Sequence, residues 1–138
     1  MRIILLSTKY WDVALNEDQA YLGRGILVLK RNCGDLAKLT KEEIIELFEI
    51  IKKLEKAIKK AFKAEMFNWT CLMNDAYKQT PPKPQVHLHL RPRYRKDVTF
   101  EGKVFKDPEF AHHYNKERKD IVSEILLNKI AEKIKQNL

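Results

Sequence analysis

The sequence predicts an α+β domain in which helices pack on an antiparallel sheet. Three observations carry this prediction: β-type runs follow one another closely, one long amphipathic helix interrupts them, and a second helical stripe closes the chain. At 138 residues the chain can bury a hydrophobic core without disulfides or metals. We therefore expect a single domain over residues 1–138, with its core at about 11–95 and a C-terminal hairpin and helix at about 97–138.

The first strands are expected at about 11–15 and at 22–30. The second run, LGRGILVLK, is aliphatic and β-branched and opens on Gly23 and Gly25. Glycines in a strand allow another group to approach the backbone closely. The run is therefore typical of a strand beside a binding site.

A long helix is expected at about 40–62. Thr40 with Glu43 three residues later forms a capping-box sequence, which is typical of a helix N-terminus. Apolar residues then recur at helical spacing, so one face can pack on a sheet while the lysines face water. These apolar residues are Ile44, Leu47, Phe48, Ile51, Leu54, Ile58 and Phe62.

Two further strands are expected on either side of a proline-rich loop. Residues 65–73 alternate as a strand does, and we assign Trp69 in this run to the core. The loop at 74–85 holds three of the prolines, which keep it out of any sheet interior. The chain then enters the run VHLHLRPR at 86–93.

The C-terminal part is expected to form a hairpin and a helix. In VTFEGKVF, at 98–105, a Glu-Gly turn separates two short β-type runs. From about Lys116, apolar residues recur at helical spacing, which predicts a helix. These residues are Ile121, Val122, Ile125, Leu126, Ile130 and Ile134.

Composition and charge restrict the partners. The 27 Lys and Arg against 19 Asp and Glu give a formal charge of +8, which attracts anions such as nucleotides, yet no nucleic-acid module is recognisable. No apolar run reaches the roughly 18 residues that a membrane span needs, and MRIILLS is too short for a signal peptide. Cys33 and Cys71 lack metal-ligand spacing. We expect a soluble cytoplasmic protein with reduced thiols that binds neither nucleic acid nor membranes.

The run at 86–93 places four nitrogen-rich side chains on one strand face. Successive side chains of a strand point to opposite faces, so one face carries His87, His89, Arg91 and Arg93. Groups that carry or can gain positive charge repel one another at this spacing unless an anion binds there. The face therefore predicts an anion-binding site.

Three roles are compatible with the two histidines. A zinc site would need further ligands, but the other histidines, His112 and His113, lie in a polar connector, and the arginines would repel a divalent cation; we expect no metal. A structural role would have the rings hydrogen-bond to neighbouring backbone. In the third role, neutral imidazole attacks phosphorus while the arginines hold the phosphate oxygens. Only the third accounts for both residue types.

HLHLRPRY, at 87–94, resembles the signature of the histidine-triad (HIT) family of nucleotide hydrolases and transferases, which is His-x-His-x-His followed by two apolar residues. The first two histidines match, and Arg91 stands in the third position. Further matches follow in the family's order over about residues 11–95, and an ordered set is far more specific than one short motif. They are Asn16, GRGILVLK at 23–30, DLAKLTKEE at 35–43, and Asn74.

The resemblance implies a fold and a set of roles. The family fold is an antiparallel sheet of about five strands with flanking helices, usually as a homodimer whose sheets join. His89 would attack the α-phosphorus and form a nucleotidyl-histidine, while His87 would orient it or the phosphate. Asn16 would bind ribose hydroxyls, and Asn74 would contact the ribose-phosphate region.

Two arginines depart from the family pattern. Arg24 stands where the family has a histidine after the glycine, and Arg91 replaces the third histidine. Both changes favour a tighter hold on polyphosphate and remove proton transfer at these positions. Arg93 is a further candidate for phosphate binding. The family's Gly-Gln-Ser/Thr before the histidines is absent, and the candidates to assist the leaving group there are Lys83 and Gln85.

The expected function is hydrolysis at the α-phosphate of a dinucleoside polyphosphate, or of a related AMP ester or phosphoramidate, in a homodimer. No cofactor is required, although a divalent cation can accompany the substrate. The altered third position leaves two alternatives open. One is nucleotidyl transfer or phosphorolysis, and the other is a non-catalytic nucleotide sensor on the same fold.

Overall fold

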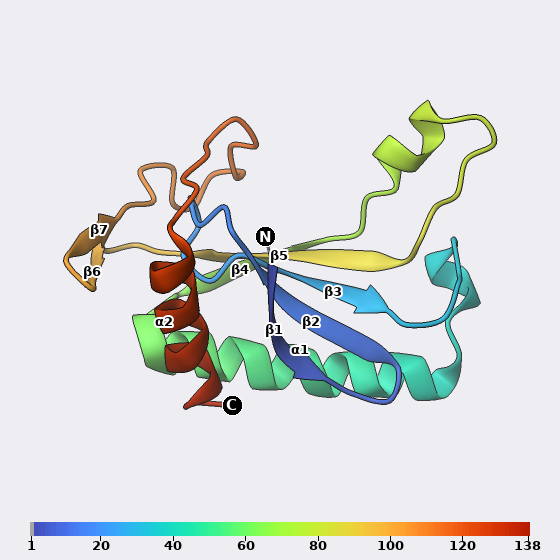
Figure 1. Cartoon of the computed structure of the whole chain (residues 1–138), viewed down its shortest axis with the longest axis horizontal. Helices are drawn as coiled ribbons and strands as arrows, with labels where there is room; N and C mark the ends of the chain where they lie inside the picture. Colours follow the sequence, from blue (N-terminus) through green and yellow to red (C-terminus); the bar gives the residue numbers. More distant parts are fainter. Residues whose placement is uncertain (1) are drawn as a thin grey trace.

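The computed structural model describes residues 2–138, in which five strands form one antiparallel sheet in the order β1-β2-β3-β5-β4 (Figure 1). Two α-helices, two short 3₁₀ helices and a separate two-stranded hairpin are the other elements of the described residues. The predicted α+β class and five-stranded antiparallel sheet are confirmed. The strands of the sheet are β1 (Arg2–Ser7), β2 (Trp11–Asn16), β3 (Gly25–Leu29), β4 (Met66–Thr70) and β5 (His87–Arg93).

Strand β1 is not among the strands predicted from the sequence. Its apolar run is short, and only Leu5 within it is buried, so local alternation is weak. Pairing with β2, from Arg2 opposite Asn16 to Ser7 opposite Asp12, makes it a strand. A short apolar run without alternation does not distinguish strand from other structure, so the non-local partner decides.

Helix α1 (Lys41–Phe62) begins with the predicted capping box. Thr40 Oγ1 accepts from the Glu43 N–H at 3.2 Å, and the Glu43 carboxylate accepts from the Thr40 N–H at 2.8 Å. The apolar stripe is rotated from the prediction, because Ile50 and Ala57 are buried whereas Ile44 and Phe48 are 42% and 56% exposed. The apolar surface of α1 is wider than the part that the sheet covers, so some of its apolar side chains stay exposed.

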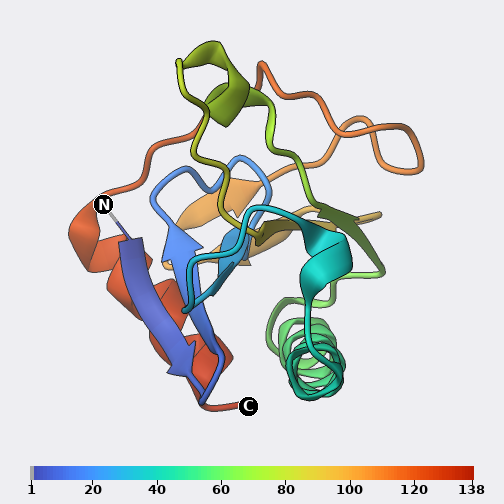
Figure 2. The ribbon, with the colours of Figure 1, turned by 90° about the vertical axis from the view of Figure 1, so that its right-hand side faces the viewer.

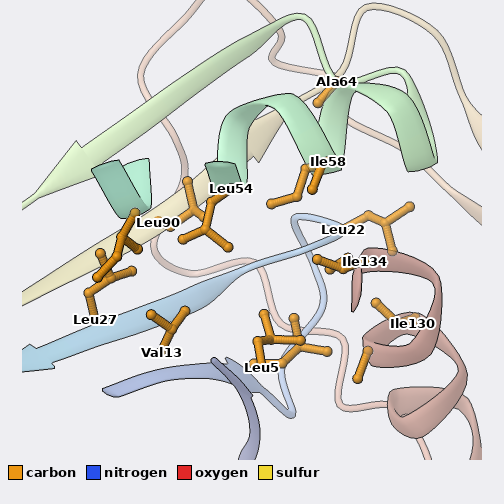
Figure 3. Close-up of a cluster of buried hydrophobic side chains, with 14 of the residues drawn as sticks. Leu5, Val13, Leu22, Leu27, Leu54, Ile58, Ala64, Leu90, Ile130 and Ile134 are labelled. Atoms are coloured by element: carbon orange, nitrogen blue, oxygen red, sulfur yellow. The ribbon is translucent and has the colours of Figure 1, made fainter. Parts of the chain in front are cut away.

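The core lies between α1, α2 (Glu124–Lys135) and the face of the sheet that they cover (Figure 3). Buried side chains of the sheet meet those of both helices, which removes a continuous apolar surface from water. Trp69 is partly buried against this core and donates to Glu55 at 2.9 Å. The labelled core side chains include Leu5, Val13, Leu27 and Leu90 from the strands, Leu54 and Ile58 from α1, and Ile130 and Ile134 from α2.

The predicted start of the C-terminal helix near residue 116 is wrong. Helix α2 begins after Ser123, whose hydroxyl accepts from the Leu126 N–H at 3.2 Å. Ile121 and Ile125 are 59% and 72% exposed and form no buried stripe. Residues 106–122, which we call the strap, are held by non-local hydrogen bonds that compete with a helical ladder.

The hairpin predicted at 98–105 is confirmed as β6 (Val98–Phe100) and β7 (Lys103–Phe105). Glu101 and Gly102 between the strands have φ of 51° and 76°, which is the pattern of a type I′ turn. Beyond it, the strap and the loop at 71–86 lie on the side of the sheet opposite α1 (Figure 2). Among residues 2–138, no helix is long and apolar enough to cross a membrane.

Candidate active site

Cross-strand pairing assembles the site on the sheet face that points away from α1. In β5, His89 lies opposite Ile26 of β3 and Thr70 of β4, and Arg91 lies opposite Asn68. Residues directly opposite one another in an antiparallel pair project from the same face. The alternation inferred from the sequence therefore holds, with α1 on one side of β5 and the histidine and arginine side chains on the other.

The ring of His87 has a defined tautomer. Its Nδ1 lies 2.7 Å from the carbonyl oxygen of Gln85, and a carbonyl oxygen can only accept a hydrogen bond. The proton of neutral His87 therefore sits on Nδ1, which leaves Nε2 as an acceptor. The ring also packs edge to face against that of His89, with centroids 4.9 Å apart.

His89 is partly buried and uncharged at neutral pH. Burial is the largest cause that lowers the pKa of this ring, and together with the positive charges of His87, Arg91, Arg24 and Arg2 it brings the pKa to about 4. No hydrogen bond within the described residues engages its ring. The lone pair of an uncharged, unbonded imidazole is free to attack an electrophile.

Arg24 is tied to an acidic residue that sequence analysis missed. Arg24 Nη1 lies 2.6 Å from Asp18 Oδ2, and the buried Arg24 Nε has no hydrogen-bond partner among residues 2–138. The backbone N–H of Asn16 donates to the Arg24 carbonyl at 3.0 Å, so the two predicted ligand-binding residues are neighbours. The Asn16 Oδ1 accepts from the Asp18 N–H at 2.9 Å.

The loop that carries Arg24 is held by one buried side chain, Gln19. Its Nε2 donates to the carbonyls of Asn16 and Arg24 at 2.6 and 3.0 Å, and its Oε1 accepts from the Gly23 N–H at 2.7 Å. These bonds satisfy the backbone of a loop that turns through Gly23 at φ 89°. Arg24 is thereby presented from a rigid support.

Arg91 is buried, yet no hydrogen bond of the described residues engages its guanidinium. It is 8% exposed, and its guanidinium carbon lies 4.0 Å from the ring centroid of Tyr114. Burial lowers the pKa of Arg91, and the nearby charge of Arg24 lowers it further. Arg24 and Arg91 thus place two guanidinium groups with free donors close to each other and to His89. Their mutual repulsion would be relieved by a bound anion.

A cavity of about 290 Å³ brings Asn74 together with both histidines. Its walls come from β5, from the short helix η2 (Asn74–Lys78), from the loop before β5, and from the strap. Its volume lies at the lower edge of the range usual for small-molecule sites. The lining residues are Leu72, Met73, Asn74, Asp75, Ala76, Gln85, His87, His89 and Lys116.

The expectation that Arg93 binds phosphate is corrected by the structure. The side chain of Arg93 is fully buried and forms a two-pronged ion pair with Asp107, at 2.7 and 3.0 Å. Its remaining donors bond Asn68 Oδ1 and the carbonyls of Glu109 and His112 at 2.7 to 2.9 Å. With its donors engaged by the protein, Arg93 has none left to offer a ligand.

Lys83 and Gln85 also differ from the sequence expectation. The Gln85 amide donates to the carbonyls of Leu29 and Arg31 at 2.8 Å and accepts from the Cys33 N–H at 3.1 Å, so it ties the end of β3 to the loop. Gln85 still lines the cavity. Lys83 is exposed and lines a different hollow on the surface.

Three residues beside the site carry no local sequence signal that marks them as functional. Asp18 could have been sought as the counter-charge of a partly buried arginine at position 24. Tyr114 and Lys116 reach the site only because the strap folds back over β5. Within residues 2–138, no group of three or more His, Cys, Asp or Glu side chains is arranged to hold a metal ion.

Comparison with known proteins agrees with the resemblance in the motifs. The model of the HIT domain family matches residues 4–96, which run from within β1 to beyond the end of β5. No curated protein matches the chain. The strap and α2 lie outside the matched residues.

Solved structures share the fold along nearly the whole chain. A HIT-like protein involved in cell-cycle regulation from Bartonella henselae has a TM-score of 0.68 at 19% identity, over 100% of this chain and 88% of that one. A histidine triad protein from Sinorhizobium meliloti reaches 0.71 at 20% identity, over 99% and 90%. The diadenosine triphosphate hydrolase of Plasmodium falciparum reaches 0.64 at 19% identity, over 96% and 74%. Identities this low establish the fold alone, while the family match over most of the chain shows that this protein belongs to the HIT domain family, which includes nucleotide hydrolases and transferases.

Proposed function

We propose that the protein hydrolyses dinucleoside polyphosphates, or related AMP esters and phosphoramidates, at the α-phosphate through a nucleotidyl-His89 intermediate. One observation carries the proposal. The uncharged imidazole of His89, which forms no hydrogen bond, lines a cavity, and two arginines with free donors, Arg24 and Arg91, lie near the ring. The similarity in fold to a diadenosine triphosphate hydrolase is consistent with this substrate class.

In the first step the lone pair of one His89 ring nitrogen forms a bond to the α-phosphorus. In a polyphosphate the bond from that phosphorus to the bridging oxygen breaks, and the leaving phosphate departs with the electron pair. In an ester or phosphoramidate the bond to the leaving oxygen or nitrogen breaks instead, and the leaving group takes the electron pair and a proton from solvent. Negative charge that develops on the non-bridging oxygens is met by Arg24 and Arg91, which carry fixed positive charge. His87, with its proton on Nδ1, orients the His89 ring or the phosphate.

In the second step water attacks the same phosphorus on the opposite side. A phosphorus–oxygen bond forms, the phosphorus–nitrogen bond breaks, and the electron pair returns to His89. The protons of the water pass to solvent, and a nucleoside monophosphate leaves. Asn16 binds the ribose hydroxyls and Asn74 the ribose-phosphate region. No resident cofactor takes part, although a divalent cation can arrive with the polyphosphate.

Capture of the intermediate tests the proposal. The protein is mixed briefly with diadenosine triphosphate or adenosine phosphoramidate and quenched in alkaline denaturant, because phosphorus–nitrogen bonds to histidine hydrolyse in acid. Intact mass spectrometry should show one added nucleotidyl group, and fragmentation should assign it to His89. Stable binding with no adduct and no product would identify the protein as a nucleotide sensor instead.

The same reaction distinguishes hydrolysis from transfer. With diadenosine triphosphate and added inorganic phosphate, the first step releases one ADP in either case. A hydrolase then releases AMP, whereas a phosphorylase releases a second ADP and no AMP, because phosphate replaces water in the second step. We expect AMP. Arg91 in place of the third family histidine is the feature that makes this comparison necessary.

The pKa of His89 sets the expected pH dependence. The reactive form is neutral imidazole, and a lowered pKa keeps that form populated down to more acidic pH. The acidic limb of kcat/KM should therefore lie near pH 4 rather than near 6.5, the usual value for histidine. Arg91→Met removes a neighbouring positive charge and should move the limb upward.

Arg95→Met is the control for this profile. Arg95 is exposed and paired with Glu65 at 2.8 Å, away from the His89 ring, so the limb should not move. A wild-type limb at about pH 6.5 would contradict the assignment of His89 as a buried, electrostatically shifted nucleophile.

We further propose that two copies pair through α1 and strand β4. Strand β4 is at the edge of the sheet, and Ile44 and Phe48 of α1 are 42% and 56% exposed. Phe48→Glu should convert a wild-type dimer to a monomer in sedimentation velocity. Ile125→Glu, at a 72% exposed position of α2, should leave it dimeric. A monomeric wild type at micromolar concentration would contradict the pairing.

A further inference from the structure

The strap, residues 106–122, is held firmly at its first end. Arg93 pairs with Asp107 in the interior and donates to the carbonyls of Glu109 and His112 at 2.9 and 2.7 Å. The side chains of Arg93 and Asp107 are 0% and 1% exposed, so water does not compete for these bonds. The arginine expected to bind phosphate instead fixes the chain that crosses above β5.

The second end of the strap is held by the loop between β2 and β3. Asp18 Oδ1 accepts from the Asp120 N–H at 2.9 Å, and the Gln19 N–H donates to the Asp120 carbonyl at 2.8 Å. The Val122 N–H donates to the Glu17 carbonyl at 3.1 Å. Asp18 therefore holds both Arg24, through Oδ2, and the strap.

Between these ends the strap delivers two side chains to the site. Tyr114 stacks on Arg91, and the adjacent Asn115 N–H donates to the Tyr21 hydroxyl at 2.7 Å. Lys116 follows and lines the 290 Å³ cavity together with His87 and His89. A backbone fixed on both sides of residue 116 limits the directions in which its side chain can extend.

The ammonium group of Lys116 is available for an anion. No ion pair or hydrogen bond of the described residues engages it. Asp75, the acidic residue of the cavity, is already paired with Lys78 at 2.8 Å. Arg24 and Arg91 do not line this cavity, so Lys116 approaches His89 from the side of His87, and the arginines approach from the other side.

We propose that Lys116 binds the phosphates beyond the one that His89 attacks, so that the strap makes the site selective for nucleoside polyphosphates over monophosphate esters and amides. This inference rests on the proposed function. Arg24 and Arg91 hold the α-phosphate, whereas Lys116 meets the charge of the leaving phosphate as the bridging bond breaks. A substrate with a single phosphate offers this ammonium group no second anion.

The test compares two substrates that share the α-phosphate and the nucleophile. For diadenosine triphosphate, Lys116→Ala should lower kcat/KM by about 10- to 100-fold, the loss typical of one hydrogen bond to a charged group. For adenosine phosphoramidate the change should stay below about 3-fold, because it has no β-phosphate to lose contact with. Lys116→Arg should recover most of the activity on the triphosphate.

Lys119→Ala is the matched control, since Lys119 is an exposed lysine of the same strap that does not line the cavity. This substitution should leave kcat/KM unchanged for both substrates. Equal losses on both substrates with Lys116→Ala would mean that the residue only supports the strap, and no loss on either would mean that it contacts no phosphate. Both results overturn the inference while the proposed function stands.

Nucleotide affinity tests the same inference when the protein shows no measurable turnover. In the His89→Ala background, ADP should bind more tightly than AMP, and Lys116→Ala should remove that difference. An unchanged difference overturns the role of Lys116. Wild-type protein that neither binds nor converts any adenine nucleotide overturns the proposed function, and this inference with it.

Discussion

His89→Ala should reduce the rate of AMP release from diadenosine triphosphate by about 10⁴- to 10⁶-fold, the size of loss seen when a covalent nucleophile is removed. The rate falls because no group remains to form the covalent intermediate. Arg24 and Arg91 can still hold the phosphate. Substrate binding should change much less than turnover. Measurement of kcat and of the dissociation constant for the same nucleotide separates the two effects.

The control for this substitution is His113→Ala, because His113 is an exposed histidine in the strap and does not line the cavity. It should retain wild-type turnover. His87→Gln should be intermediate, since an amide can accept or donate hydrogen bonds but cannot reproduce the imidazole fully. AMP release by His89→Ala at the wild-type rate would refute the proposed mechanism.

Asp107→Ala should lower the free energy of unfolding by about 3–5 kcal/mol, the usual cost of removing one partner of a buried ion pair. The substitution leaves the fully buried Arg93 guanidinium without its counter-charge and removes an acceptor of the Tyr94 N–H. Urea denaturation at neutral pH measures the change. The double variant Arg93→Met with Asp107→Leu should recover much of the lost stability, because no charge then remains buried.

Glu65→Gln provides the comparison for an exposed pair. Glu65 and Arg95 are 2.8 Å apart, as close as the buried pair, but their side chains are 49% and 63% exposed. Water and salt screen such a pair, so its loss should cost less than about 1 kcal/mol. If Asp107→Ala costs no more than Glu65→Gln, the Arg93–Asp107 pair does not hold the strap in the way described.

Local chemistry made part of the fold predictable. The capping box at Thr40 and Glu43 marks the start of α1 because it involves residues three positions apart. The Glu101–Gly102 turn predicts the hairpin for the same reason. Strand β1 and the true start of α2 escaped prediction, because pairing with β2 and attachment of the strap decide them across long stretches of sequence.

The sequence by itself determined which side chains share the face of β5, since the period of a strand is set by the backbone, and the ordered motifs indicated the family. Only the tertiary structure decided what each side chain on that face does. Arg91 and Arg93 are the same residue type two positions apart, yet one lies at the edge of the site and the other is buried against Asp107. The difference arises because burial and ion pairing depend on residues 107–116, whose position above the sheet no local pattern encodes.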